Sequence, residues 1–341
     1  MNEFVPSSNV PPLNNEQLAS TDKVNNFFII KTANDTIREA AERPDPNPLF
    51  LTIWYETQVC CLFADSNVGK SILGVQVGAE IANFQTVLYF DFELSDKQFQ
   101  LRYTDKNTGQ LHEFPQNFYR LEVNIEGFDF DTDIEEAVIK NMEQVALSMN
   151  AKVLIVDNLT WICNESEKGD AAGRLMKSLM QLKKKHDLSI LVLAHTPKRS
   201  LSNPITQNDL AGSKKLFNFF DSVFAIGFSA KDEGQRYIKQ LKSRSGEIVY
   251  NSNNVLVCCI EQVGAFLQFT KIGFATEKEH LKALNKDEET ALLENVIALQ
   301  NEGKTQRVIA VELGISTSKV NRLLKKYYGN GIRPESRKNI G

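Results

Sequence analysis

The stretch that decides the fold is Ala64-Asp65-Ser66-Asn67-Val68-Gly69-Lys70-Ser71. It follows the apolar run 59–63 and precedes the run 72–77, so it joins a buried strand to a helix. A phosphate-binding P-loop requires this context. Ala64 stands where the usual motif begins with glycine, at a position that needs a small residue and not a positive φ. The stretch therefore predicts a site for a nucleoside triphosphate, and a chance glycine turn between strand and helix is the weaker alternative.

Each part of this loop has an expected role. The backbone N–H groups from Ala64 to Ser71 and the N-terminus of the following helix are expected to point at the β-phosphate. Lys70 would place its charge between the β- and γ-phosphates, and the Ser71 hydroxyl would ligate Mg²⁺. The expected cofactors are therefore ATP and Mg²⁺.

Composition sets the general class of the protein. The chain has 341 residues, enough for one large α/β domain plus a small one, and its 42% hydrophobic content can fill a core. Its net charge of −4 argues by itself neither for nor against a nucleic-acid partner. Its five cysteines have neither CxxC spacing nor a histidine set nearby, so buried thiols are expected and not disulfides or zinc ligands. No segment reads as a signal peptide or a membrane span, so we expect a cytoplasmic protein with no membrane partner.

The chain reads as four segments. Residues 1–48 form an N-terminal arm, with helical spacing over 24–41 before a proline cluster. Residues 49–275 alternate strand and helix, with expected strands at 59–63, 87–92, 152–157, 189–194 and 222–228. Continuous apolar strands of this kind indicate a mainly parallel sheet covered on both faces, and the runs 237–242, 254–261 and 266–274 are close enough to be antiparallel. We expect a linker at 276–286 and a small all-α domain at 287–341.

Two carboxylates are candidates for the nucleotide site. Lys152-Val153-Leu154-Ile155-Val156-Asp157 has the form of a Walker B strand, and Asp157 is expected beside the P-loop strand, where it would hold Mg²⁺ through water. The next residue, Asn158, is not the glutamate that could polarise the attacking water. Glu93, at the end of the run 87–93, is the best candidate for that role. Its alternative is a carboxylate that merely stabilises the N-terminus of the next helix.

The order of these motifs resembles the RecA-like ATPase core, in particular the RepA and DnaB-like branch of hexameric helicases. The resemblance covers about residues 49–275 and rests on the segments 87–102, 191–198, 211–213 and 242–246. It implies a RecA-like fold and ATP hydrolysis, and that Arg102, which ends the helix after Glu93, contacts the nucleotide. It further implies that His195 is a sensor between the γ-phosphate and a DNA-binding loop. Without the resemblance, His195 could be an ordinary surface residue.

The resemblance also gives roles to four basic residues. In the family, the loop that matches residues 196–209 lines a central channel and touches single-stranded DNA, which would make Lys198 and Arg199 DNA contacts. Lys242 and Arg244 alternate on a strand edge and would reach the γ-phosphate of a neighbouring subunit, as an arginine finger does. That role implies a homo-oligomer, a hexamer in this family. Read without the family, both pairs would be solvated surface residues.

The end of the chain is basic, with nine Lys or Arg against three Glu over residues 302–341. Residues 306–324 have the spacing of a helix-turn-helix, with Ala310 at the helix crossing, Gly314 at the turn and Ser316 as a cap. The shared core would be Ile309, Leu313, Ile315, Val320 and Leu323. Side chains able to reach base edges and phosphates would lie on the outer face: Thr317, Ser318, Asn321, Arg322 and Lys325. The unit resembles the resolvase and sigma-factor type, and a helical hairpin for protein contact is the alternative.

Two functions follow from this reading. The favoured one is an ATP-driven motor of RepA-like type, a helicase or translocase in replication or mobilisation of a plasmid or mobile element. Its partners would be single-stranded DNA in the channel and duplex DNA at the helix-turn-helix. The other is an ATP-switched regulator or replication initiator that binds DNA without separating its strands.

Overall fold

The computed structural model describes residues 28–124, 134–159, 170–196, 199–210, 214–283, 286–313, 315 and 317–328. The chain forms two compact units, residues 1–46 and 47–341. In the first unit, helix α2 (Ala33–Ala41) begins after Thr32, whose side chain accepts a hydrogen bond from the backbone N–H of Asp35. Residues 28–32 are not helical, so the helical spacing predicted from residue 24 is wrong over that stretch. The cap explains where the helix begins.

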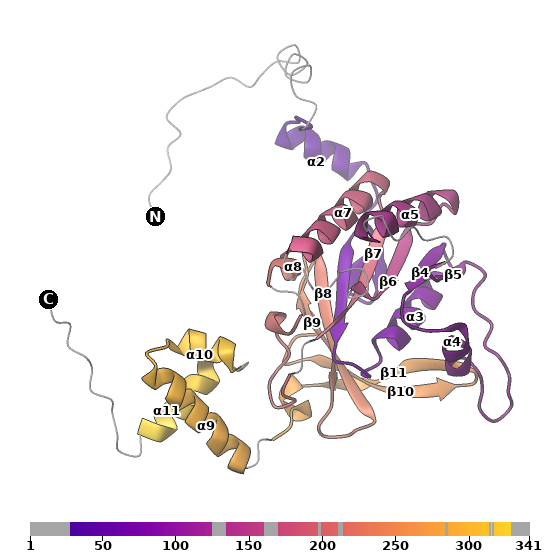
Figure 1. The fold of residues 1–341 in the computed structure, drawn as a ribbon. Helices are drawn as coiled ribbons and strands as arrows, with labels where there is room; N and C mark the ends of the chain where they lie inside the picture. Colours follow the sequence, from indigo (N-terminus) through magenta and orange to yellow (C-terminus); the bar gives the residue numbers. More distant parts are fainter. Residues whose placement is uncertain are drawn as a thin grey trace, which may run out of the picture. The chain divides into compact units, whose positions relative to one another are not determined.

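The second unit contains a nine-stranded sheet (Figure 1), in the order β11-β10-β9-β8-β3-β7-β6-β4-β5. The strands from β5 to β8 are parallel, and β9, β10 and β11 continue the sheet in antiparallel pairs. The α/β fold class with a mainly parallel sheet is therefore confirmed. The strands of this sheet are β3 (Val59–Ala64), β4 (Val87–Asp91), β5 (Phe118–Leu121), β6 (Val153–Asp157), β7 (Ser189–His195), β8 (Ser222–Phe228), β9 (Gln235–Lys242), β10 (Val255–Val263) and β11 (Phe266–Ala275).

The order of the strands corrects two expectations. Strand β7 pairs with both β3 and β6, so the Walker B strand is not beside the P-loop strand but one strand away. The carboxyl end of β7, with His195, therefore lies between the P-loop and Asp157. Strand β9 lies between β8 and β10, so it is not an edge strand of the sheet. Both errors concern pairing between segments far apart in the chain, which an apolar run does not encode.

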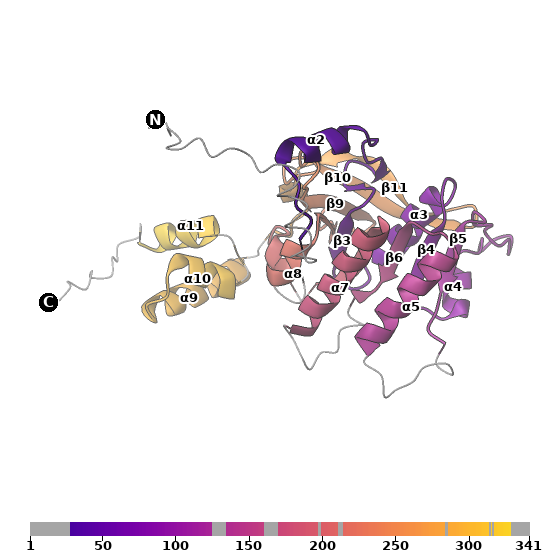
Figure 2. The same cartoon turned by 90° about the horizontal axis from the view of Figure 1, so that it is seen from above.

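The sheet is covered on both faces because its strands alternate side chains between two cores. The other elements around the sheet are β1 (Pro48–Phe50), β2 (Trp54–Tyr55), α3 (Lys70–Ile81), α4 (Asp96–Arg102), α5 (Ile134–Ser148), α7 (Asp170–His186), η3 (Gln207–Asp209), α8 (Lys214–Phe219) and η4 (Glu277–His280). Along β3, Cys61 and Phe63 face a core that also holds Met142, while Cys60 and Leu62 face a core with Leu73 of α3. Figure 2 shows α5, α7 and α8 together on one side of the sheet.

Three helices end the described chain: α9 (Lys286–Asn301), α10 (Gln306–Glu312) and α11 (Thr317–Tyr328). They share a small core of Val296, Ile309, Ala310, Ile315, Val320, Leu323 and Leu324, with Leu313 packed against it. On α11, the polar residues Thr317, Ser318, Asn321, Arg322 and Lys325 are exposed. Gly314 and Ser316, the expected turn and cap, lie outside the described residues.

The described cysteines, Cys60, Cys61, Cys258 and Cys259, are free thiols. Burial raises the pKa of Cys60 and of Cys258 to about 12, so their thiols stay protonated at neutral pH. Among the described helices, none is long and apolar enough to cross a membrane.

Candidate functional site

The predicted P-loop joins β3 to α3, as the sequence indicates. Two of its residues have positive φ, Asn67 at 63° and Gly69 at 106°. A side chain at Gly69 would also meet hairpin β10–β11, since an added Cβ would lie 2.6 Å from Ile260 Cδ1. The positive φ is what favours glycine there, and a larger residue would also have to displace the Ile260 side chain. The loop therefore lies against that hairpin and leads directly into the N-terminus of α3.

Lys70 folds back on the loop. Its ammonium donates to the carbonyl oxygens of Ala64 at 2.9 Å and Asp65 at 3.0 Å. Burial lowers the pKa of Lys70, while the carboxylates of Asp157 and Glu93 act in the opposite direction. A triphosphate in the loop would supply this buried cation with a direct anionic partner.

Asp157 and Ser71 fit a magnesium site. Asp157 is fully buried, and its Oδ2 accepts a 2.5 Å hydrogen bond from the Tyr89 hydroxyl. Its Oδ1 has no hydrogen-bond partner in the part of the chain that the structure describes. Burial raises the pKa of Asp157 to about 6, and the nearby Ser71 hydroxyl lowers it in part. A buried carboxylate oxygen beside a hydroxyl is a suitable donor pair for Mg²⁺, which takes its remaining ligands from phosphates and water.

Glu93 and His195 lie in contact, and Asn158 joins them. His195 Nε2 lies 3.2 Å from Glu93 Oε1, and the Asn158 amide also donates to Glu93 Oε1. On the other side of the ring, His195 Nδ1 lies 3.2 Å from the Lys70 ammonium. Hydrogen bonds from His195 and Asn158 lower the pKa of Glu93, although its partial burial raises it. We call Lys70, Glu93, Asn158 and His195 the Lys70 cluster.

The contact with Lys70 assigns the tautomer of His195. A lysine ammonium can only donate, so Nδ1 accepts from Lys70 and the ring proton lies on Nε2, facing Glu93. The Asn158 amide nitrogen also lies 2.9 Å from Nε2, so in this tautomer Asn158 donates to Glu93 and not to the imidazole. Glu93 thus accepts two hydrogen bonds on one oxygen. A carboxylate held ionised in this way, at the edge of a P-loop, can orient a water molecule and accept its proton.

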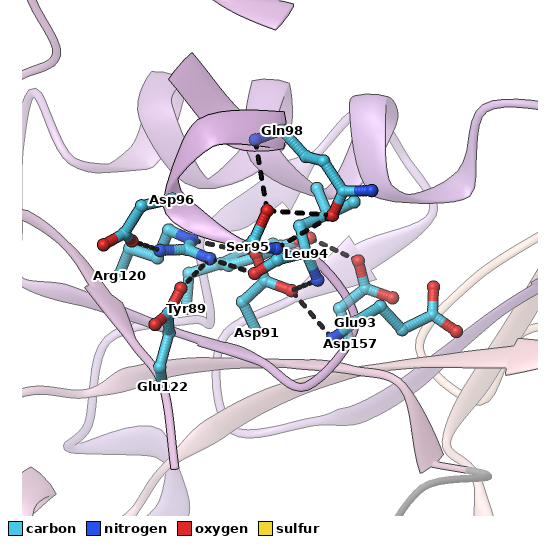
Figure 3. A network of polar contacts seen from close by, with 10 residues as sticks. All are labelled: Tyr89, Asp91, Glu93, Leu94, Ser95, Asp96, Gln98, Arg120, Glu122 and Asp157. Carbon is cyan, nitrogen blue, oxygen red and sulfur yellow. Dashed lines mark hydrogen bonds and ion pairs between the residues drawn. The ribbon is translucent and has the colours of Figure 1, made fainter. Parts of the chain in front are cut away.

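The turn that carries Glu93 is held by residues the sequence analysis did not identify. Asp91 Oδ1 accepts hydrogen bonds from the backbone N–H groups of Glu93 and Leu94, at 3.1 and 3.0 Å. Its Oδ2 forms a 2.8 Å ion pair with Arg120 of β5, as Figure 3 shows. The Asp91 side chain is fully buried and Arg120 only 14% exposed. The position of Asp91, two residues before Glu93, is the one sequence signal for this turn.

Lys242 and Arg244 are not near this cluster. Arg244 Nη1 donates to Asp221 Oδ1 at 2.9 Å, and Asp221 Oδ2 accepts from the N–H of Val59, the first residue of β3. Lys242 donates to the carbonyl oxygens of Phe217 and Asn218. The P-loop begins at Ala64, the last residue of β3, so the two basic residues lie at the opposite end of that strand, roughly 16 Å away at about 3.3 Å per residue.

The remaining predicted residues have separate locations. The side chain of Arg199 is only 8% exposed and forms an ion pair with Asp65 of the P-loop, and its expected contact with single-stranded DNA stays a prediction. Lys198 lies outside the described residues. Arg102 is the last residue of α4 and is half-buried, outside the Lys70 cluster.

This fold and site define a P-loop ATPase with a RecA-like core. A family model described as "AAA domain" matches residues 30–200, half of the chain, and the chain therefore belongs to the AAA domain family. It is also similar to DNA repair protein RadA of Streptococcus pyogenes, serotypes M6 and M1, at 26% identity over 193 residues. The match covers 53% of this chain and 35% of each relative, so the chain spans about a third of the length of these relatives.

Proposed function

We propose that the protein is an ATP-hydrolysing motor that acts on DNA, of RepA-like type, in replication or mobilisation of a plasmid or mobile element. The observation that carries the proposal is the Lys70 cluster, in which a P-loop lysine, a histidine and a candidate general base are joined by hydrogen bonds. The RadA relatives are named as DNA repair proteins, which agrees with a DNA-directed role.

In the proposed reaction, Lys70 leaves the loop carbonyls and binds the β- and γ-phosphates. Ser71 and Asp157 would hold Mg²⁺, which would neutralise charge on the phosphate oxygens when bound. Glu93 orients a water molecule and accepts its proton while the water oxygen bonds to the γ-phosphorus and the bond to the β–γ bridging oxygen breaks. His195 loses its donor when Lys70 moves, so its contact with Glu93 can respond to the bound nucleotide.

Arg244 takes part from a neighbouring subunit. Its distance from the P-loop of its own subunit excludes a direct role there, and its side chain is 51% exposed. Asp221, which also pairs with Lys183 at 2.9 Å, holds the guanidinium in a defined position at the amino end of β3. A guanidinium presented in this way can stabilise transition-state charge in the next subunit of a ring. We propose a homo-oligomer, with a hexamer as its expected form.

The C-terminal helices bind duplex DNA in this proposal. Helices α10 and α11 are the two helices of a helix-turn-helix, and α11 presents the exposed polar residues named above. The second candidate function, an ATP-switched regulator or initiator, is favoured by this same unit because a motor does not need sequence-specific duplex binding.

A strand-displacement assay on a fork with a 5′ single-stranded tail separates the two functions. The motor should unwind the fork with ATP and Mg²⁺, while Lys70→Ala, measured in parallel, should not. ATP hydrolysis and duplex binding without any strand displacement, on forks of either polarity, would favour the regulator.

A further inference from the structure

Arg199 is turned toward the nucleotide site. Its Nε lies 3.5 Å from Asp65 Oδ2, and its Nη1 donates to the Asn203 carbonyl at 2.9 Å. The Arg199 side chain is 8% exposed and that of Asp65 is 25% exposed, so solvent screens this ion pair only in part. The pair connects the segment after β7 directly to the second residue of the P-loop.

The carboxylate of Asp65 lies where its negative charge would disfavour the binding of an anionic ligand. Its backbone carbonyl accepts from the Lys70 ammonium at 3.0 Å, which places the residue beside the cation that would bind the phosphates. Burial raises the pKa of Asp65, while the charges of Arg199 and Lys70 lower it. An ionised carboxylate here would repel a triphosphate unless a fixed cation neutralised it.

The segment that carries Arg199 is itself anchored. The backbone N–H of Ile205 donates to Glu277 Oε1 at 2.7 Å, and the carbonyl of Ile205 accepts from Lys239 at 2.6 Å. Lys239 and Glu277 form a buried ion pair at 2.6 Å. With Ile205 held on both of its backbone groups, the guanidinium of Arg199 is presented to Asp65 from a fixed loop, which reduces the entropy lost in forming the pair.

We propose that Arg199 is a positioning residue of the nucleotide site, which neutralises Asp65 and so allows the P-loop to bind a triphosphate. This inference rests on the proposed nucleotide binding. It assigns Arg199 to the ATP site and not to the DNA channel. Binding of ATP should depend on Arg199 more than binding of ADP does. ATP carries one more negative charge, on the terminal phosphate, which is the one nearest to Lys70.

The test is a charge-rescue cycle with a fluorescent ATP analogue and its ADP counterpart. Arg199→Met should weaken ATP binding by at least about tenfold, with a smaller loss for ADP, because the cation that neutralises the Asp65 carboxylate is removed. Arg199→Lys should retain most of the affinity. Asp65→Asn alone should have little effect, and the double variant Asp65→Asn, Arg199→Met should recover most of the lost affinity, since no carboxylate then remains to repel the phosphates. In steady-state hydrolysis the loss should appear in KM more than in kcat.

Arg236→Met is the matched control, because Arg236 is another half-buried arginine, packed 4.1 Å from the Phe228 ring centroid. It should leave ATP binding unchanged. Normal ATP affinity in Arg199→Met would overturn the inference, and so would a double variant that binds no better than Arg199→Met, which would indicate a general disruption of the loop. An Arg199→Met protein that keeps its ATP affinity and loses single-stranded DNA binding would return Arg199 to the DNA channel. If the unaltered protein binds no nucleotide at all, the proposed function itself fails.

Discussion

The ammonium of Lys70 and the Nδ1 of His195 lie 3.2 Å apart. Because the same imidazole reaches Glu93 with its other nitrogen, the phosphate-binding lysine and the candidate general base are joined through one side chain. A ligand that draws Lys70 away changes the hydrogen bonding of Glu93 without touching it. The P-loop lysine and the candidate general base are therefore parts of one hydrogen-bonded unit. Substitution of Lys70 and substitution of Glu93 should nevertheless affect nucleotide binding and hydrolysis differently.

Glu93→Gln should bind ATP normally and hydrolyse it on the order of a hundredfold more slowly, because the amide can orient water but cannot accept its proton. Lys70→Ala should instead lose nucleotide binding or hydrolysis altogether. Binding of a fluorescent ATP analogue and phosphate release, measured on both variants, separate these effects. Normal turnover by Glu93→Gln would remove that residue from the mechanism.

The ion pair between Asp91 and Arg120 should matter for both stability and turnover. Arg120→Met would leave the fully buried carboxylate of Asp91 without its cation, which we expect to cost about 3 kcal/mol in the free energy of unfolding. Because Asp91 holds the turn that carries Glu93, kcat should also fall while ATP affinity changes little.

Urea denaturation and steady-state hydrolysis check this prediction. The matched control is Lys185→Met. Lys185 has a side chain of similar length to that of Arg120 and forms an ion pair with Glu143, but its side chain is 67% exposed. That change should cost less than about 1 kcal/mol. Equal losses of stability in the two variants would show that burial does not set the contribution of the Asp91 pair.

Arg244→Ala should bind ATP nearly as well as the unaltered protein and hydrolyse it poorly, because the residue lies at the far end of β3 from its own P-loop. Mixing Arg244→Ala with Lys70→Ala should restore part of the activity. In a mixed interface, the intact P-loop of one variant faces the intact arginine of the other. Hydrolysis should also rise with protein concentration as subunits assemble, and full activity of the monomer would contradict the finger assignment.

The sequence predicts well where the strands lie and poorly which strands pair with each other in the sheet. The expected strand at 222–228 coincides with β8, and that at 189–194 is one residue shorter than β7, because a buried parallel strand is a continuous apolar run. The position of β7 between β3 and β6 depends on pairing between distant segments. The alternation of strand and helix implies a helix where α5 and another where α7 lies, but it gives no bounds for these helices, which together cover one face of the sheet.

The same limit applies to the site. Lys70, Glu93 and His195 could be found because each follows directly from a strand or a motif. Arg120 lies 29 residues after Asp91, and no local pattern marks their ion pair. Arg199 looked like an exposed loop residue because its partner, Asp65, is distant in the sequence and close only in the fold. Charge composition alone does not separate a solvated cation from a paired one.

The C-terminal helices should bind duplex DNA separately from the ATPase site. Removal of the chain after Asp287 should leave single-stranded DNA-stimulated ATPase largely intact and abolish sequence-specific duplex binding. In the full chain, Asn321→Ala and Arg322→Ala should each weaken specific binding by roughly 1 to 3 kcal/mol, because both side chains are exposed on α11 and can reach base edges.

Fluorescence anisotropy against a selected target and a scrambled duplex, over a range of salt concentrations, measures both effects. Lys304→Ala is a suitable control, since Lys304 precedes α10 and is paired with Glu312 at 2.8 Å. It should change specific and non-specific binding little. If the truncated protein selects the same duplex sequence as the full chain, α10 and α11 form a protein-contact unit and the duplex-reading surface lies in the ATPase core.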